Sequence, residues 1–381
     1  MESKKGIQPY ILLLAFVFYF STMISKSIYD VLSPYTDYVL YIAVILCIFF
    51  SQYVYAKDVK NHLKYFSFFL AYGIFSILNT NGGIGSLLGF AFVPLYVCGL
   101  EKIVFTRKAK RSFLILFVGF ILVLSVTASY ITNNYSWTKN NFISPNTYGL
   151  TCSFCFMYAY IFMLGLEFRH KKLFTWLLFA LTIYVNYELD CRTAMYTSLL
   201  FFFAISFVPS IFLKKRFLMT VIIVLLILPF VFPIIYVNFY TSGVDLKLPF
   251  TDKSLYTGRE LIWSMFFSHM GSNLKNWLIG VGSKVPIYVD TGRSQSQHLH
   301  NNTLALLTIF GIIGTLMTYS YLLKNIKRIM SRYPEGNKKL VTCLIVFICF
   351  IFEGFTENTM VGVSLFPLLC LGLLLDNEGE L

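Results

Sequence analysis

The feature that most constrains this chain is a succession of long apolar stretches separated by short polar connections. Most of the stretches approach the roughly 20 apolar residues that a helix needs to cross a bilayer. Inside a membrane such segments must be helical, because every backbone polar group needs a partner within the protein. We therefore predict an all-α, polytopic membrane protein with about twelve transmembrane helices: Tyr10–Ile24, Tyr38–Tyr55, Tyr65–Leu78, Ile84–Leu100, Phe113–Ala128, Tyr148–Leu166, Phe174–Leu189, Thr193–Phe212, Phe217–Val237, Asn301–Leu323, Leu340–Phe355 and Val361–Leu375.

The composition excludes several other classes of protein. Only 13% of the residues are charged and 57% are hydrophobic, whereas a soluble domain carries about 25% charged residues. This argues against a soluble enzyme, a disordered chain and a secreted disulfide scaffold. All cysteines but Cys191 lie inside apolar runs, which is typical of packing positions. Cys152 and Cys155 form a CxxC without a second pair, so we predict no metal site and no cofactor.

The basic residues are distributed unevenly between the connections. The net charge is +13, and most of the lysines and arginines cluster in every second connection, as they do in cytoplasmic loops. This pattern predicts that both termini are cytoplasmic. It also explains the excess of basic residues without a nucleic-acid partner. Lys4 and Lys5 precede the first apolar run without a small-residue cleavage site after it, so we interpret this run as an uncleaved first span.

The longest connection comprises residues 238–299, between the ninth and tenth predicted spans. We expect residues 1–381 to form a single membrane domain with this one long extracytoplasmic loop, and long loops often carry function. Thr257 and Glu260 have the spacing of a capping box at a helix start. The segment Leu261–Met270 that follows is rich in aromatic residues, and we predict a short helix at the membrane surface.

Two arginines on the predicted outer side are candidate anion-binding residues. Arg192 lies between two spans, where it could pair with Glu188 or Asp190 as an ordinary rim residue, or hold phosphate oxygens with its guanidinium group. Arg259 falls in the first turn of the loop helix, where a cation opposes the helix dipole. Either Glu260 balances that charge, or a phosphate shares the helix N-terminus with Arg259.

Two histidines stand just before the tenth predicted span. His298 and His300 could be hydrogen-bonded interfacial residues, or one of them could act as a general base, since the ordinary pKa of histidine lies near physiological pH. No third ligand in a recognisable pattern supports a zinc site. Asn301 directly follows His300 and is a further candidate contact to the substrate.

Three further polar residues lie near the same predicted rim. Asn146, after Pro145, suits a helix start but could also contact a polar substrate. Glu353 and Glu357 flank Gly354 near the end of the eleventh span. We favour pairing of these carboxylates with the arginines, with contact to acceptor hydroxyls as the alternative.

Several short motifs occur together and in order. They are Arg192-Thr-Ala, Thr257-Gly-Arg-x-x-x-Trp263, Leu278-Ile-Gly-Val-Gly282, His300-Asn-Asn-Thr-Leu304 and Phe310-Gly-Ile-Ile-Gly314. With twelve spans and the long outer loop, this set resembles the superfamily of O-antigen ligases and of O-antigen and capsular polysaccharide polymerases. The resemblance covers roughly residues 144–314, and the first five spans match in topology only.

The resemblance implies an inverting, metal-independent glycosyltransferase with a GT-C-like fold in the bacterial inner membrane, with its active site facing outward. The donor would be a glycan on undecaprenyl diphosphate, and the acceptor a second lipid-linked glycan. Arg192 and Arg259 would hold the diphosphate, and His300, or else His298, would deprotonate the acceptor hydroxyl. A chain-length regulator is a possible partner.

The motifs resemble those of repeat-unit polymerases more than those of ligases, so we predict a polymerase. Transfer of finished polysaccharide to lipid A core is the alternative within the same chemistry. A flippase for the same lipid-linked sugars is the alternative from another class, but it should carry ionisable residues near the middle of its spans and a repeat symmetry between its halves. A scaffold for glycan machinery would leave Arg192, Arg259 and His300 freely replaceable.

Overall fold

The computed structural model describes most of the chain, and nearly all of the described residues are helical. The described residues are 7–24, 39, 42–43, 45–47, 57–80, 82–101, 103, 105–135, 144–166, 169–208, 214–244, 256, 258–282, 289–290, 295–296 and 299–356. The helices are α1 (Gln8–Ile24), α3 (Lys57–Asn79), α4 (Ile84–Ala91), α5 (Val93–Glu101), α6 (Arg107–Asn134), α7 (Pro145–Leu164), α8 (Lys171–Glu188), α9 (Arg192–Ser206), α10 (Lys215–Thr241), α11 (Arg259–Met270), α12 (Leu274–Ile279), α13 (Asn302–Arg332) and α14 (Lys338–Glu353). Strands β1 (Val289–Asp290) and β2 (Gln295–Ser296) form a short antiparallel pair.

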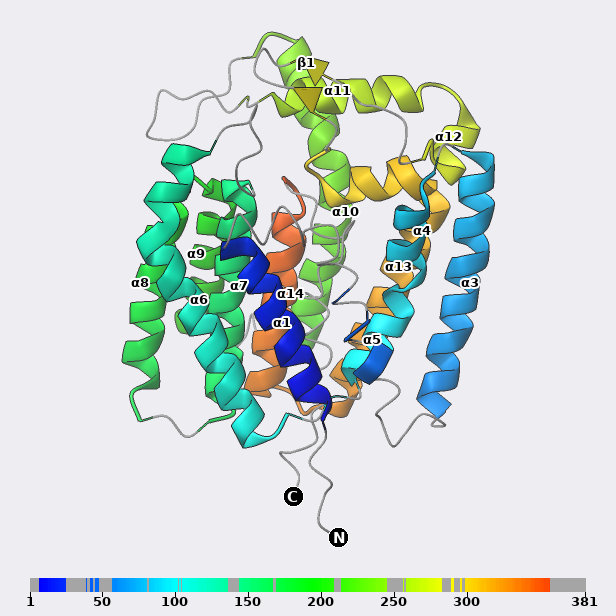
Figure 1. Cartoon of the computed structure of the whole chain (residues 1–381). Coiled ribbons are helices and arrows are strands. Elements are labelled where there is room, and N and C mark those ends of the chain that lie inside the picture. The colour runs from blue at the N-terminus through cyan, green and yellow to red at the C-terminus, as the bar shows by residue number, and fades with distance from the viewer. Residues whose placement is uncertain are drawn as a thin grey trace.

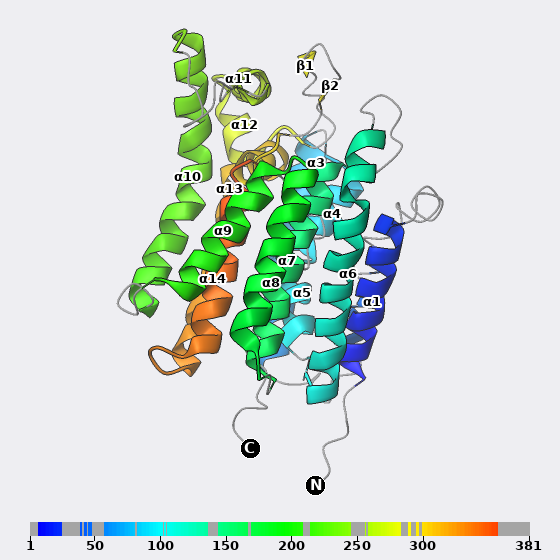
Figure 2. The same cartoon turned by 90° about the vertical axis from the view of Figure 1, so that its left-hand side faces the viewer.

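The long helices stand side by side and alternate in direction (Figure 1). Helix α7 lies at the centre of one group, packed against α6, α8, α9 and α14, and most of its side chains are buried. Figure 2 shows α1, α6 and α8 along the outside of this group. Helices α11 and α12 lie across one end of the bundle (Figure 1), and the position of α11 at the membrane surface stays a prediction. The all-α prediction is therefore confirmed for the described residues.

Four described helices, α6, α7, α10 and α13, are long and apolar enough to cross a membrane by length and composition. Helix α1 is a shorter apolar helix. These helices support an integral membrane protein, while the count of twelve spans stays a prediction. The predicted span Tyr38–Tyr55 lies largely outside the described residues, and Val361–Leu375 lies entirely outside them.

The fourth predicted span is not one helix. The stretch Ile84–Leu100 instead forms the two helices α4 and α5, which are separated at Phe92. Pro94, the second residue of α5, has no backbone N–H, so it cannot continue the hydrogen-bond ladder of α4. Hydropathy alone does not detect such a break, because the residues on both sides are apolar.

The tenth predicted span is also not straight. Helix α13 bends at Gly311, which has a φ of 62° and a ψ of −168°. Its first part, up to the bend, runs across the end of the bundle, and the remainder descends along it (Figure 1).

Three carbonyl groups of α13 next to the bend accept hydrogen bonds from other segments. The carbonyl of Thr308 accepts from the backbone N–H groups of Val281 (2.7 Å) and Gly282 (3.0 Å). The Ser76 hydroxyl donates to the carbonyl of Ile309 at 3.3 Å and the Tyr72 hydroxyl donates to the carbonyl of Phe310 at 2.7 Å. Because buried carbonyls need partners, α3 and the turn after α12 together hold the bend in place.

The two ends of the bundle differ in charge. The alternation of the helices brings the starts of α3, α6, α8, α10 and α14 and the end of α13 to one end, which we call the basic end. The lysines and arginines of the predicted cytoplasmic clusters that are among the described residues lie there, on or next to these six helices. The opposite end, which we call the loop end, carries α11, α12 and the starts of α7, α9 and α13. The charge pattern read from the sequence thus corresponds to a real asymmetry of the fold.

Candidate active site

The candidate residues lie at helix N-termini of the loop end. Arg192 is the first residue of α9, Arg259 is the first residue of α11, and Asn146 is the second residue of α7. His300 precedes Asn301, the N-cap of α13. Helix N-termini present unpaired backbone N–H groups and a partial positive charge, so this end of the bundle suits an anionic ligand.

A tight turn fixes the position of Arg192. Asp190 adopts a left-handed conformation (φ 48°), and the backbone N–H of Cys191 donates to the carbonyl of Asn186 at 2.9 Å. The Nε atom of Arg192 lies 3.6 Å from Asp190 Oδ1, and the two side chains are 39% and 74% exposed. Such an exposed ion pair contributes little stability. The guanidinium group is therefore held near the surface rather than locked into the core.

The start of α7 packs directly against this turn. A Cβ atom on Gly149 would lie 2.5 Å from Cys191 Cβ, so only glycine allows α7 to approach so closely. The Cys191 thiol lies 3.6 Å from the carbonyl oxygen of Asn146. Asn146 is thus a neighbour of the Arg192 turn, and its predicted contact with a substrate stays a prediction.

Arg259 begins α11 next to an unusual cap. Gly258 is the N-cap and adopts a left-handed conformation with φ 89°. Its backbone N–H donates to both carboxylate oxygens of the buried Glu260, at 2.9 and 3.1 Å. Glu260 therefore caps the helix, as the sequence predicted, but the cap is one residue later than the predicted Thr257, which lies outside the described residues.

His300 is held between two anchored neighbours. It has a positive φ of 48°, and the carbonyl of Leu299 before it accepts a 2.7 Å hydrogen bond from Trp263 Nε1 of α11. Because Trp263 follows Arg259 by about one helical turn, this bond ties the Arg259 helix to the His300 segment. His298, the alternative base, lies outside the described residues.

Asn301 is completely buried and connects α13, α10 and the turn after α14. Its Oδ1 accepts from the N–H of Leu304 at 2.9 Å, which caps α13. Its Nδ2 donates to the carbonyl of Pro229 at 2.9 Å and to that of Phe355 at 3.1 Å. Pro233, one turn beyond Pro229 in α10, has no N–H to donate to that carbonyl. The geometry gives Asn301 a structural role, and its predicted contact with a substrate remains untested.

The turn after α14 links the starts of α9 and α13. The hydroxyls of Thr193 and Thr356 are 2.8 Å apart, and the N–H of Asn302 donates to the carbonyl of Gly354 at 2.9 Å. Glu353, just before this turn, is completely buried, whereas Glu357 lies outside the described residues.

Hydrogen bonds thus connect the segments of all three candidate catalytic residues. The connection runs from the start of α9 through the turn after α14 to the start of α13, and from there to α11. Sequence reasoning missed Thr193, Thr356 and Asn302 as connectors. The one sequence signal for such a connection was the spacing in Gly-Arg-x-x-x-Trp, which places Trp263, the residue that bonds to Leu299, one turn after Arg259.

Within the part of the chain that the structure describes, no three His, Cys, Asp or Glu residues form a group that could hold a metal ion.

Comparison with known families identifies the segment that carries these residues. Residues 174–319 match the family model described as O-antigen ligase. This segment is an O-antigen ligase family domain. The domain extends from α8 into α13 and contains Arg192, Arg259 and His300, whereas Asn146 and Glu357 lie outside it. No curated protein matches the chain.

The contacts of Asn301 in the O-antigen ligase family domain predict that its substitution lowers stability more than loss of an ordinary helix cap does. Asn301→Ala is expected to lower the free energy of unfolding by about 2–4 kcal/mol, because a helix cap is lost and two carbonyls lose a donor. Asn337 is the matched control, since it caps α14 in the same way, accepting from Leu340 N–H at 3.0 Å. Asn337→Ala should cost only about 1 kcal/mol. Thermal unfolding of the purified variants compares the two, and equal losses would contradict the linking role of Asn301.

Proposed function

We propose that this protein is a glycosyltransferase that joins undecaprenyl diphosphate-linked oligosaccharide repeat units into a surface polysaccharide. The observation that carries the proposal is that hydrogen bonds link three helix starts at the loop end, two of them headed by arginine and one preceded by histidine. Membership of residues 174–319 in the O-antigen ligase family supports the broader statement that the protein transfers lipid-linked polysaccharide.

In the proposed reaction, Arg192 and Arg259 bind the diphosphate of the donor. An acceptor hydroxyl attacks the anomeric carbon from the face opposite the diphosphate, so the configuration inverts. The new bond joins the acceptor oxygen to the anomeric carbon, and the bond from that carbon to the diphosphate oxygen breaks. His300 takes the hydroxyl proton, and the negative charge gained by the leaving lipid diphosphate is stabilised by the two guanidinium groups and nearby backbone N–H groups.

The proposed orientation follows from the two ends of the bundle. Anchoring the basic end in the cytoplasm agrees with the positive-inside rule. The loop end then meets the outer leaflet, where the lipid-linked donor and acceptor present their sugars. In this orientation the diphosphate lies at the membrane boundary while its lipid tail stays in the bilayer.

A ligase is the second candidate, and the description of the matching family favours it. The purified protein in detergent, supplied with an undecaprenyl diphosphate-linked repeat unit, separates the possibilities. A polymerase is expected to produce a ladder of lipid-linked glycans from this single substrate. Product formed only after addition of lipid A core and a preassembled polysaccharide donor would show that the protein is a ligase and not a polymerase. Absence of product with either acceptor would favour a transporter.

A further inference from the structure

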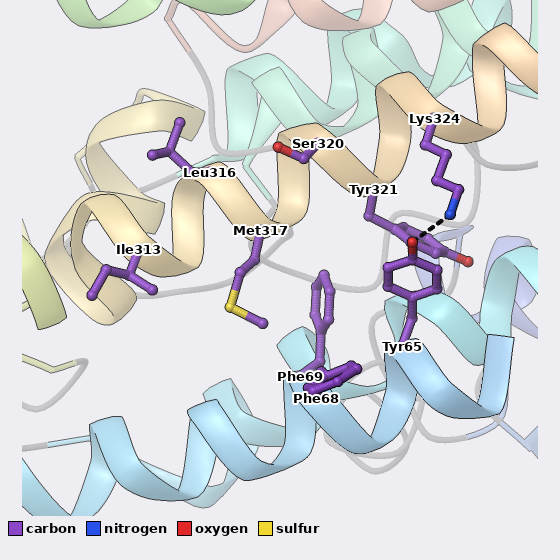
Figure 3. Close-up of a pocket in the computed structure, with 9 residues that line it drawn as sticks. All are labelled: Tyr65, Phe68, Phe69, Ile313, Leu316, Met317, Ser320, Tyr321 and Lys324. Atoms are coloured by element: carbon purple, nitrogen blue, oxygen red, sulfur yellow. Dashed lines mark hydrogen bonds between the residues drawn. The ribbon is translucent and has the colours of Figure 1, made fainter. Parts of the chain in front are cut away.

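A groove of about 540 Å³ lies between α3 and α13, away from the candidate active site. The two helices touch near the loop end, where the Tyr72 hydroxyl reaches the carbonyl of Phe310. They touch again near the basic end, where His62 Nδ1 and the Tyr321 hydroxyl are 2.7 Å apart. The groove opens along α3 and α13, and Figure 3 shows the residues of the two helices that line it.

The walls of the groove are largely apolar, and side chains of both helices that form them are exposed at the protein surface. Phe68 from α3 is 57% exposed and Leu316 from α13 is 58% exposed. The lining residues on α13 extend from Ile313 to Lys324, a distance of roughly 16 Å at the helical rise per residue. This length is close to one leaflet of a bilayer, about half of the roughly 30 Å hydrocarbon core. The groove therefore fits one acyl chain lying along the helices.

A cation stands at the end of the groove nearest the basic end. Lys324 is exposed, and its Nζ donates to the Tyr65 hydroxyl at 2.5 Å and lies 4.8 Å from the centre of the Tyr65 ring. Two of the three N–H donors of a lysine remain for another acceptor in such an arrangement. Exposed Lys64 and Lys327 lie on the same two helices, and α13 contains no acidic residue. The charge at this end is complementary to an anionic headgroup.

We propose that this groove binds one anionic phospholipid of the leaflet at the basic end. One acyl chain lies against Phe68, Leu316 and their neighbours, and the phosphate is bound by Lys324 and the Tyr65 hydroxyl. The order of the groove, apolar toward the loop end and cationic toward the basic end, distinguishes this lipid from the glycan donor. The donor's diphosphate is proposed to bind at the opposite end of the bundle.

Native mass spectrometry of the full chain, titrated with phosphatidylglycerol or phosphatidylcholine, tests the proposal. We expect one phosphatidylglycerol to bind more tightly than phosphatidylcholine. Lys324→Ala should weaken that binding about five-fold, the effect of one basic residue near a membrane surface, and Lys324→Arg should retain it. Ser320→Phe should also weaken binding, because Ser320 lines the groove and a phenyl ring would fill it.

Lys108→Ala is the matched control, since Lys108 is an exposed lysine at the basic end on α6, away from the groove. It should leave lipid binding unchanged. The proposal is overturned if Lys324→Ala binds phosphatidylglycerol like the wild type, or if Lys108→Ala weakens binding equally. Equal affinity for phosphatidylcholine, or displacement of phosphatidylglycerol by undecaprenyl diphosphate, would assign the groove to another lipid and also overturn it.

Discussion

Alanine at Arg259 is expected to reduce glycan transfer by at least about 100-fold while leaving the protein folded in the membrane. The loss should be this large because removing one preorganised group that stabilises developing charge typically costs a factor of about 10²–10³. The fold should survive because the α11 start is held by other contacts, namely the Gly258–Glu260 cap and the Trp263–Leu299 hydrogen bond. Arg192→Ala should act in the same way, since its ion pair with Asp190 is exposed.

Arg107→Ala provides the matched control for both arginines. Arg107 is likewise the first residue of a helix, α6, but it lies at the basic end. The measurement is the length distribution of surface glycans in cells that contain only the variant, together with the amount of variant protein in the membrane. Chains of normal length with Arg259→Ala would remove the proposed role of this arginine. An equal loss with Arg107→Ala would show that the effect does not depend on the candidate site.

Alanine at Gly311 is expected to destabilise the protein by about 3 kcal/mol or more and to abolish transfer. The backbone there adopts φ 62° and ψ −168°, a region that is essentially restricted to glycine. A Cβ atom would also overlap the carbonyl oxygen of Leu278. The substitution must therefore straighten α13 or displace α12, and either movement shifts the segment that begins at His300.

Gly119→Ala serves as the control for Gly311→Ala. Gly119 lies inside α6, and an added Cβ would meet no atom within 4 Å. This variant should be as stable as the wild type or slightly more stable, since alanine favours helix by up to about 1 kcal/mol over glycine. Thermal unfolding in detergent and glycan synthesis report on both variants. A Gly311→Ala protein with wild-type stability and activity would show that the bend is not required.

Among the described residues, the sequence predicted where most of the long helices lie, because apolar stretches of this length have few alternatives in a membrane. The prediction was wrong where a helix breaks or changes direction, because hydropathy does not distinguish a straight helix from a broken or bent one. The break near Pro94 could have been predicted from the sequence, because proline has no backbone N–H to continue a helix. The bend at Gly311 depends on donors from Ser76 and Tyr72 in α3, which lie more than 200 residues earlier in the chain. No local pattern around Gly311 contains that information.

The same distinction applies to the candidate site. Arg192, Arg259 and His300 were selected from local context and motif order, and the structure brings their segments to one end of the bundle. What joins these segments was not predictable, because it consists of pairs distant in sequence such as Thr193 with Thr356 and Asn301 with Pro229. Local patterns indicate which residues can perform chemistry, whereas the connections that position them depend on tertiary packing.

In the proposed reaction two arginines bind the donor diphosphate while one histidine acts on the acceptor. The most direct test is the affinity of the purified protein for undecaprenyl diphosphate, measured for the wild type, Arg192→Ala, Arg259→Ala and His300→Ala. We expect both arginine variants to bind at least about ten-fold more weakly, and His300→Ala to bind like the wild type although it transfers no sugar. Unchanged affinity in the arginine variants, or normal transfer by His300→Ala, would contradict the proposed reaction.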